Sequence, residues 1–308
     1  MRMSPNEFTV RTTVEIDKIL ALAFLSILIV LGIAQDEPIF DSIGDSRLTL
    51  FTVVLLPPIL YLAMRRSGSA LRDLVRDWWP LVCTLAVYES LKHLHANRIT
   101  EWLGITPKDE LMLAIDEWLF GRALPLWIDH WSADWFQAFM WWCYVGVYYL
   151  MPITLLGWAY VVHGETLYRR LRVGLVLCLL GGYVMYILVP VAGPVFLVGD
   201  QFEHPIPNHP ALEKVFFDTL RYYWDCFPSL HTAIPWLLTS LAWRSLRRPA
   251  RVLCVVLASL VTLSTIALRF HYGIDLIAGI AWVGLIHATV DALETRDYGR
   301  FSWSRREG

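Results

Sequence analysis

The sequence predicts an all-α integral membrane protein with about eight transmembrane helices. Of its 308 residues, 56% are apolar and only 18% are charged, whereas soluble domains usually carry about 25% charge. The mean hydropathy is +0.48, and the chain has 15 Trp residues, a residue type that gathers at membrane interfaces. Several apolar runs approach the ~20 residues that a helix needs to cross a bilayer. No segment shows the ten-residue alternation of a membrane β-barrel strand.

The apolar runs follow one another along the chain and divide it into three parts. The first two runs form an N-terminal pair within residues 1–70, six further runs occupy residues 77–292, and a tail follows at 293–308. Long loops at 98–135 and 191–228 separate some of the runs, and loops of this length are usually functional. The expected spans are 18–34, 47–64, 77–97, 136–160, 171–190, 229–245, 251–270 and 273–292.

The basic residues alternate between the connecting segments and so predict an orientation. With eight spans, 18 of the 26 Lys and Arg residues fall on the side that also holds both termini. Cytoplasmic segments carry the excess of Lys and Arg, so both termini are expected in the cytoplasm. The loops 98–135 and 191–228, the start of the sixth and eighth spans and the end of the seventh then face the periplasm or a lumen.

Composition also argues against several classes of protein. The net charge is −2 and the basic residues form no extended patch, so no nucleic-acid partner is expected. Four of the five cysteines lie in apolar runs, which excludes an intrachain disulfide framework and a compact metal motif. Residues 1–17 are polar and contain acids, unlike a cleavable signal peptide. The cysteines are Cys83, Cys143, Cys178, Cys226 and Cys254.

The first long loop contains an amphipathic segment at 110–121 that is too short to span a membrane. We expect an interfacial or re-entrant helix that ends at Gly121. Membrane anchoring is its simplest role, and a lid that shapes lipid entry is the alternative. Tryptophans continue an aromatic belt after it, at Trp127, Trp131, Trp135, Trp141 and Trp142.

His271 and Asp275 form the first candidate catalytic pair. Residues four apart share one face of a helix, so the carboxylate can accept the proton on one imidazole nitrogen. The other nitrogen then keeps a lone pair that can attack phosphorus and form a phosphohistidine. The same spacing recurs at His287 and Asp291, near the cytoplasmic end of the last span, where a structural polar pair is the simpler interpretation.

His231 is the second candidate, because it follows a helix-start signal. Pro228 precedes the expected helix and Ser229 is a natural N-cap, which places His231 in the first turn. A helix N-terminus can bind phosphate through its backbone N–H groups. His231 can therefore protonate a leaving oxygen and deprotonate an acceptor as a general acid and base.

These motifs resemble the type 2 phosphatidic acid phosphatase superfamily of membrane lipid phosphatases and phosphotransferases. Its Pro-Ser-x-His motif is matched by Pro228, Ser229 and His231. In its third motif, Ser-Arg precedes His and Asp; here Ser264, His271 and Asp275 match, but Thr265 replaces the arginine. Its first motif, Lys followed six residues later by Arg-Pro, has no match. The resemblance covers residues 77–292 and implies a six-helix catalytic core.

The departures resemble the branch that contains inositol phosphorylceramide synthase. There the third motif reads Ser-Thr and then His-Tyr-x-x-Asp, as at 264–265 and 271–275 here. The runs at 226–231 and 116–121 also resemble the corresponding segments of that branch. This resemblance implies transfer of a phospho-head group, such as phosphoinositol, to a lipid or sugar alcohol.

The residues that hold the phosphate are less defined, because the expected arginines are absent. Ser229 and the nearby Arg269 are the first candidates, followed by Arg221, Lys214 and Lys92, the last of which is equally well explained by an ion pair with Glu89. A metal site at His93, His95, His204 and His209 matches no compact ligand spacing, so neither a metal nor another cofactor is expected.

We therefore expect a membrane-embedded lipid phosphotransferase, with His271 as nucleophile, Asp275 as its orienting group and His231 as acid and base. Its partners would be the bilayer, a phospholipid or lipid-phosphate donor, and a lipid alcohol, sugar alcohol or water as acceptor. Two alternatives stay open: a polyprenyl or diacylglycerol phosphate phosphatase, and a non-enzymatic transporter or scaffold. A bacterial inner membrane is the expected location, with the active site on the periplasmic or lumenal side.

Overall fold

The computed structural model describes residues 16–24, 70–93, 100–130, 132–204 and 222–304. The chain divides into two compact units, residues 1–99 with 297–308, and residues 100–296. The first unit contains a helix at 16–24 and helix α3 (Ala70–His93). The expected span at 47–64, and most of the one at 18–34, lie outside the described residues.

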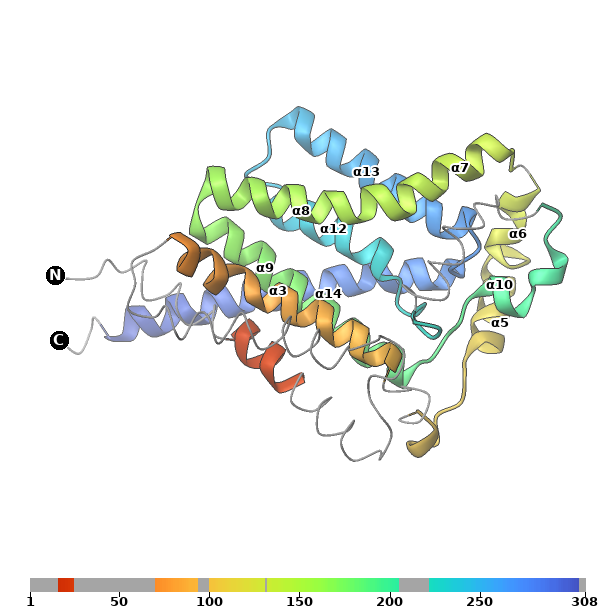
Figure 1. Ribbon diagram of the computed structural model, residues 1–308, viewed down its shortest axis with the longest axis horizontal. Helices are drawn as coiled ribbons and strands as arrows, with labels where there is room; N and C mark the ends of the chain where they lie inside the picture. The colour runs from red at the N-terminus through yellow and green to blue at the C-terminus, as the bar shows by residue number, and fades with distance from the viewer. Residues whose placement is uncertain (1–15, 25–69, 94–99, 131, 205–221, 305–308) are drawn as a thin grey trace. The chain divides into compact units, whose positions relative to one another are not determined.

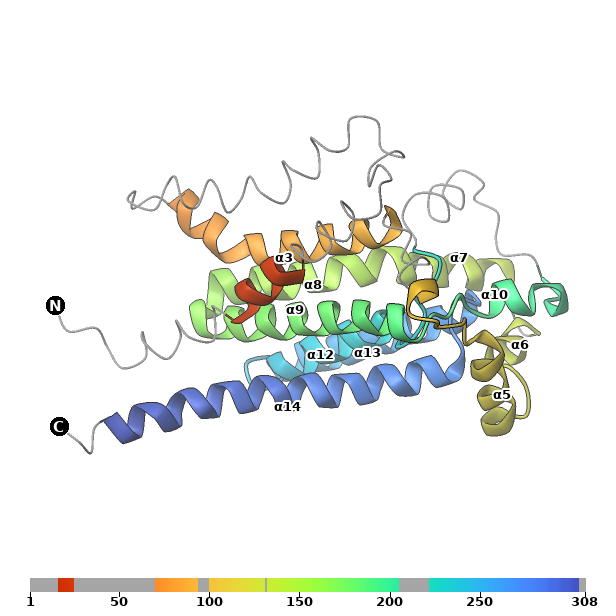
Figure 2. The same ribbon diagram turned by 90° about the horizontal axis from the view of Figure 1, so that it is seen from below.

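The second unit is a helical bundle with the short helices of its longer connecting segments at one end. Figures 1 and 2 show α8, α9, α12, α13 and α14 running side by side, with α5, α6 and α10 together beyond one end of α9. The elements are α5 (Asp109–Phe120), α6 (Leu124–Asp129), α7 (Asp134–Trp142), the π-turn η1 (Cys143–Val147), α8 (Tyr148–Trp158), the π-turn η2 (Ala159–His163), α9 (Glu165–Leu188), α10 (Pro194–Leu197), the 3₁₀ turn η3 (Gly199–Gln201), α12 (Leu230–Ala242), α13 (Arg248–Ala267) and α14 (Gly273–Ser304). The residues of α14 from Asp297 onward are assigned to the first unit.

Within the described residues, four helices are long and apolar enough to cross a membrane. They are Asp134–His163, Glu165–Leu188, Arg248–Ala267 and Gly273–Glu294, which confirms helical candidates at four of the expected spans. The helix at the sixth expected span, α12, has 13 residues and is therefore about 20 Å long, less than a hydrocarbon core of about 30 Å. The count of eight spans, the six-helix core and the domain boundaries drawn from the sequence stay predictions.

Helix α5 ends where the sequence predicts. Gly121 adopts a left-handed conformation (φ 82°), and its N–H donates to the Glu117 carbonyl, which closes the last turn. Glycine reaches this conformation without the steric cost that a Cβ atom brings. Among the described residues of the expected loop 98–135 are the helices α5 and α6.

Close contact between α14 and the start of α12 depends on a glycine. A Cβ atom built on Gly279 would lie 2.8 Å from the Ser229 carbonyl oxygen and 3.2 Å from the Thr232 Cβ. Small residues let helices approach closely in membrane proteins, where packing rather than the hydrophobic effect holds helices together. Gly279 thus allows the first turn of α12 to lie directly against α14.

Replacing Gly279 with alanine should destabilise the second unit by about 1–3 kcal/mol, the usual cost of overpacking. The clash is with backbone, which cannot rotate away as a side chain can. Gly284→Ala is the matched control, because a Cβ atom at Gly284 meets nothing within 4 Å on the same helix. Thermal unfolding in detergent should show a lower Tm for Gly279→Ala alone, and equal Tm values for the two variants would contradict the packing argument.

Candidate functional site

The two histidine motifs meet where α12 and α14 begin. The Ser229 N–H donates to the Asp275 carbonyl at 3.1 Å, so the two helix starts are hydrogen-bonded to each other. The imidazole rings of His231 and His271 lie 6.1 Å apart between centroids and are tilted by 56°. His231 and His271, which are forty positions apart in the sequence, therefore lie close together.

His271 and Asp275 form the contact that their spacing predicts. His271 Nδ1 lies 3.3 Å from Asp275 Oδ2, and the two side chains are 2% and 0% exposed. The same Oδ2 accepts the N–H of Tyr272 at 2.9 Å, as in a capping box where the third helical residue reaches back to the cap. Asp275 therefore caps the start of its own helix and also contacts the His271 imidazole.

His231 is held between two tyrosine rings. Its ring stacks on Tyr144 at 4.0 Å and 13° and on Tyr148 at 3.9 Å and 29°, so the two rings occupy its opposite faces. The π-turn η1 lies between α7 and α8 and carries Tyr144, and π-turns occur often at functional sites. Nothing in the sequence predicted these two contacts.

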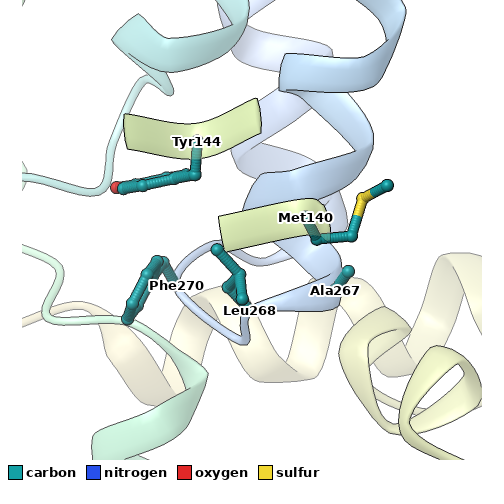
Figure 3. Packing of buried hydrophobic residues seen from close by; sticks show 5 residues of the cluster. All are labelled: Met140, Tyr144, Ala267, Leu268 and Phe270. Atoms are coloured by element: carbon teal, nitrogen blue, oxygen red, sulfur yellow. The ribbon is translucent and has the colours of Figure 1, made fainter. Parts of the chain in front are cut away.

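The Tyr144 ring also belongs to the buried cluster that supports the His271 turn. Tyr144 and Phe270 lie 5.0 Å apart between ring centroids, and Figure 3 shows them next to each other with Leu268, Ala267 and Met140 alongside. One wall of packed side chains thus connects the partner of His231 with the residue before His271.

Asp116 of α5 caps the start of α14. Its Oδ2 accepts the N–H of Gly273 at 2.8 Å and that of Leu124 at 3.2 Å, and its Oδ1 accepts the N–H of Ile274 at 2.9 Å. The side chain is completely buried. The first N–H groups of a helix have no partner inside the helix, and here a carboxylate 157 residues away supplies one.

Asp109, two turns earlier on α5, holds the segment that precedes α10. Its carboxylate accepts the N–H groups of Ala192 and Gly193 at 2.9–3.1 Å. The Tyr272 hydroxyl donates to it at 3.4 Å. Burial, and then the nearby Asp109 and Asp275 carboxylates, raise the pKa of Tyr272 well above its usual value, so this hydroxyl stays protonated and donates.

The orientation of α5 is the reverse of an ordinary amphipathic surface helix. Its buried residues are Asp109, Met112 and Asp116, whereas Leu111 and Trp118 are 53% and 82% exposed. Two acids, Asp109 and Asp116, therefore point inward, and two large apolar side chains point outward. The sequence pattern revealed an amphipathic helix, but it gave no signal that the carboxylates belonged to the inner face.

Arg269 lies in the turn before His271 with a left-handed backbone (φ 66°). Its Nη2 donates to Asp129 and to the His204 carbonyl, and its guanidinium lies 4.4 Å from the Phe202 ring centroid. Burial lowers the pKa of Arg269 and the Asp129 carboxylate opposes that shift. Its Nε is buried with no hydrogen-bond partner in the described part of the chain.

The hydroxyl groups of the Ser-Thr pair are used within their own helix. Ser264 Oγ donates to the Val261 carbonyl at 2.6 Å and Thr265 Oγ1 to the Thr262 carbonyl at 2.8 Å. Ser229 caps α12 as predicted, and its Oγ accepts the Thr232 N–H at 3.2 Å. Of these three hydroxyls, only that of Ser229 lies at a helix start.

The second His–Asp pair belongs to a polar cluster far along α14. His287 Nδ1 lies 3.0 Å from Ser240 Oγ, and Arg170 contacts Asp291 at 2.5 Å and also pairs with Glu294. Sixteen residues of helix separate His287 from His271, or about 24 Å. The cluster connects α9, α12 and α14, in keeping with the structural interpretation.

The other basic candidates cannot be placed. Arg221 and Lys214 lie outside the described residues, as do the side chains of Lys92, Glu89 and His93, and residues His95 and His209. Among the residues that are described, no group of three or more His, Cys, Asp or Glu side chains could hold a metal ion.

Comparison with known proteins identifies the family. A family model described as PAP2 superfamily matches residues 110–289, more than half of the chain and all of His231, His271 and Asp275. Searches of curated proteins and of solved structures give no significant match. The match confirms the superfamily that the motifs indicated. With its apolar helices, the chain is thus a multi-pass membrane protein that belongs to the PAP2 superfamily of phosphatases and phosphotransferases.

Proposed function

We propose that this protein moves a phosphate-bearing head group from a lipid phosphoester to an alcohol, through a phosphohistidine on His271. The observation that carries the proposal is the pair of imidazole rings 6.1 Å apart between centroids, with a carboxylate beside Nδ1 of His271. Two imidazoles this close can both contact one phosphate group, one at the phosphorus atom and the other at an oxygen bonded to it.

In the first step His271 is the nucleophile. Asp275 accepts the proton on Nδ1, which leaves Nε2 with the lone pair that attacks phosphorus. An N–P bond forms as the bond between phosphorus and the departing lipid oxygen breaks, and His231 gives its proton to that oxygen. The positive charge that develops on the His271 ring is stabilised by the Asp275 carboxylate.

In the second step His231 acts in the reverse sense. It takes the proton from the acceptor hydroxyl, whose oxygen attacks phosphorus while the N–P bond breaks and the His271 lone pair returns. The two stacked tyrosines restrict rotation of the His231 ring. The ring therefore keeps one orientation for both proton transfers.

The start of α12 is the better position for the phosphate oxygens. The first N–H groups of α14 are already bonded to Asp116 and Asp275, and two carboxylates there would repel an anion. Ser229 begins α12, and Arg269 adds a buried positive charge two residues before the nucleophile. Arg221 and Lys92 stay further candidates from the sequence.

The donor and acceptor follow from the resemblance in the motifs. The Ser-Thr pair at 264–265 and the run at 271–275 favour the branch of inositol phosphorylceramide synthase, hence phosphoinositol transfer to a lipid or sugar alcohol. The same groups would also act with water, which makes a polyprenyl or diacylglycerol phosphate phosphatase the second candidate. We propose that this chemistry occurs at the periplasmic or lumenal face, a side favoured by the excess of Lys and Arg on the opposite side, and in a bacterial inner membrane.

His271→Ala should reduce turnover by a factor on the order of 10³ or more, because it removes the nucleophile. The assay uses purified protein in detergent and phosphatidylinositol or a lipid phosphate labelled at phosphorus. His287→Ala is the matched control, since it removes the other histidine that has an aspartate four residues on. Equal losses in the two variants, or wild-type activity in His271→Ala, would contradict the assignment of His271, and no turnover by the wild type would favour a scaffold or transporter.

The same assay, run with and without lipid alcohols, separates transfer from hydrolysis. We expect the label to appear in a new lipid when an alcohol acceptor is present. Label released as inorganic phosphate, with no dependence on the alcohol, would establish the phosphatase and overturn the transferase.

Tyr148→Leu should lower kcat by about two- to tenfold, because an aromatic stacking contact contributes about 0.5–1.5 kcal/mol and its loss frees the His231 ring. Tyr148→Phe keeps the ring and should stay close to the wild type. Phe139→Leu, at an exposed aromatic residue of α7, controls for general loss of aromatic surface. If Tyr148→Phe fell as far as Tyr148→Leu, the hydroxyl rather than the stacking would be the active feature.

A further inference from the structure

We infer that Asp116 is a positioning residue for the reaction, which fixes the start of α14 and so holds His271 and Asp275 in their reactive arrangement. This role rests on the proposed function, in which His271 is the nucleophile. The family comparison assigns no role to Asp116, and the sequence pattern gave α5 only an anchoring or lid role.

The hydrogen bonds at the start of α14 form a closed set. The N–H groups of Gly273 and Ile274 donate to Asp116, the N–H of Tyr272 donates to Asp275, and the N–H of Asp275 donates to the Tyr272 carbonyl. Each N–H group in this first turn thus has an acceptor, and Asp116 supplies two of the four. Both of its oxygens are used, so the carboxylate fixes the direction of the helix start as well as its place.

The turn before α14 is held from the α13 side, because the N–H groups of Phe270 and His271 donate to the Thr265 carbonyl at 3.0 and 3.3 Å. Asp116 holds the α14 side of this turn, across which the His271 imidazole reaches Asp275. A shift of Gly273 and Ile274 would carry Asp275 away from His271 Nδ1. Because misplacement by about 1 Å can cost about 10²-fold in rate, the carboxylate of Asp116 acts on the reaction without touching the substrate.

The third bond of Asp116 extends the same control to α6. Its Oδ2 also accepts the Leu124 N–H, and α6 ends at Asp129, the partner of Arg269. One buried carboxylate therefore sets α5, α6 and the start of α14 against each other. Its negative charge also interacts favourably with the positive end of the α14 dipole.

Asp116→Asn is the sharp test, because an amide offers one acceptor oxygen and one donor nitrogen in place of two acceptors. Whichever way the amide turns, an NH₂ group faces an N–H group of the helix start or of Leu124. We expect kcat per folded enzyme to fall about 10²-fold while KM changes less than about twofold. Glu117→Gln is the matched control, since Glu117 is the exposed acid next in the chain.

A second readout needs no turnover. Ring-nitrogen NMR shifts of His271, assigned by their loss in His271→Ala, should change in Asp116→Asn and stay constant in Glu117→Gln, because the Asp275 contact sets the tautomer. If Asp116→Asn does not fold, Asp116→Glu replaces it, since the longer side chain keeps the charge and both acceptors but displaces them by one methylene group.

The outcomes separate this inference from the proposed function. A fall in kcat together with changed His271 shifts supports the positioning role. Wild-type kcat and wild-type shifts overturn it. If the wild type turned over no lipid phosphate or phosphodiester, the proposed function would fail, and the His271 shifts alone would decide whether Asp116 positions the ring.

Discussion

Carboxylates directed at the N-terminus of α14 are the constraint on which the rest of the site depends. Asp275 and Asp116 accept N–H groups of its first turn, and both side chains are completely buried. Backbone N–H groups at a helix start are strong donors for a buried charge, and both oxygens of Asp116 and Oδ2 of Asp275 accept from them. Oδ1 of Asp275 is buried with no hydrogen-bond partner among the described residues. These hydrogen bonds fix the conformation of the turn, and the turn fixes the position of His271.

The bundle brings the second histidine to this turn through a short helix and close packing. Helix α12 begins beside Asp275, and Gly279 removes the side chain that would keep the two helices apart. The π-turn in the helix from Asp134 to His163 then places Tyr144 and Tyr148 against opposite faces of His231. The His271 imidazole is therefore restrained by a carboxylate, and the His231 imidazole by two aromatic rings.

Local patterns in the sequence were enough to predict the parts of the site that depend on spacing within one element. The contact of His271 with Asp275, the Ser229 cap and the end of α5 at Gly121 are confirmed, because each follows from helix periodicity or capping chemistry. The role of Asp116 as a cap for α14 depends on a contact across 157 residues, which no single-sequence periodicity contains. The aromatic stacking on His231 depends on a π-turn, for which helix propensity gives no signal.

The most direct test of the account is capture of the covalent intermediate. Purified protein would be mixed for a short time with a phosphorus-labelled lipid donor, quenched in alkali and digested, and the modified peptide would be identified by mass spectrometry. The account predicts an acid-labile, alkali-stable phosphoryl or phosphodiester group on His271. Turnover by the wild type without label on the protein, or label on another residue, would contradict a mechanism that passes through His271.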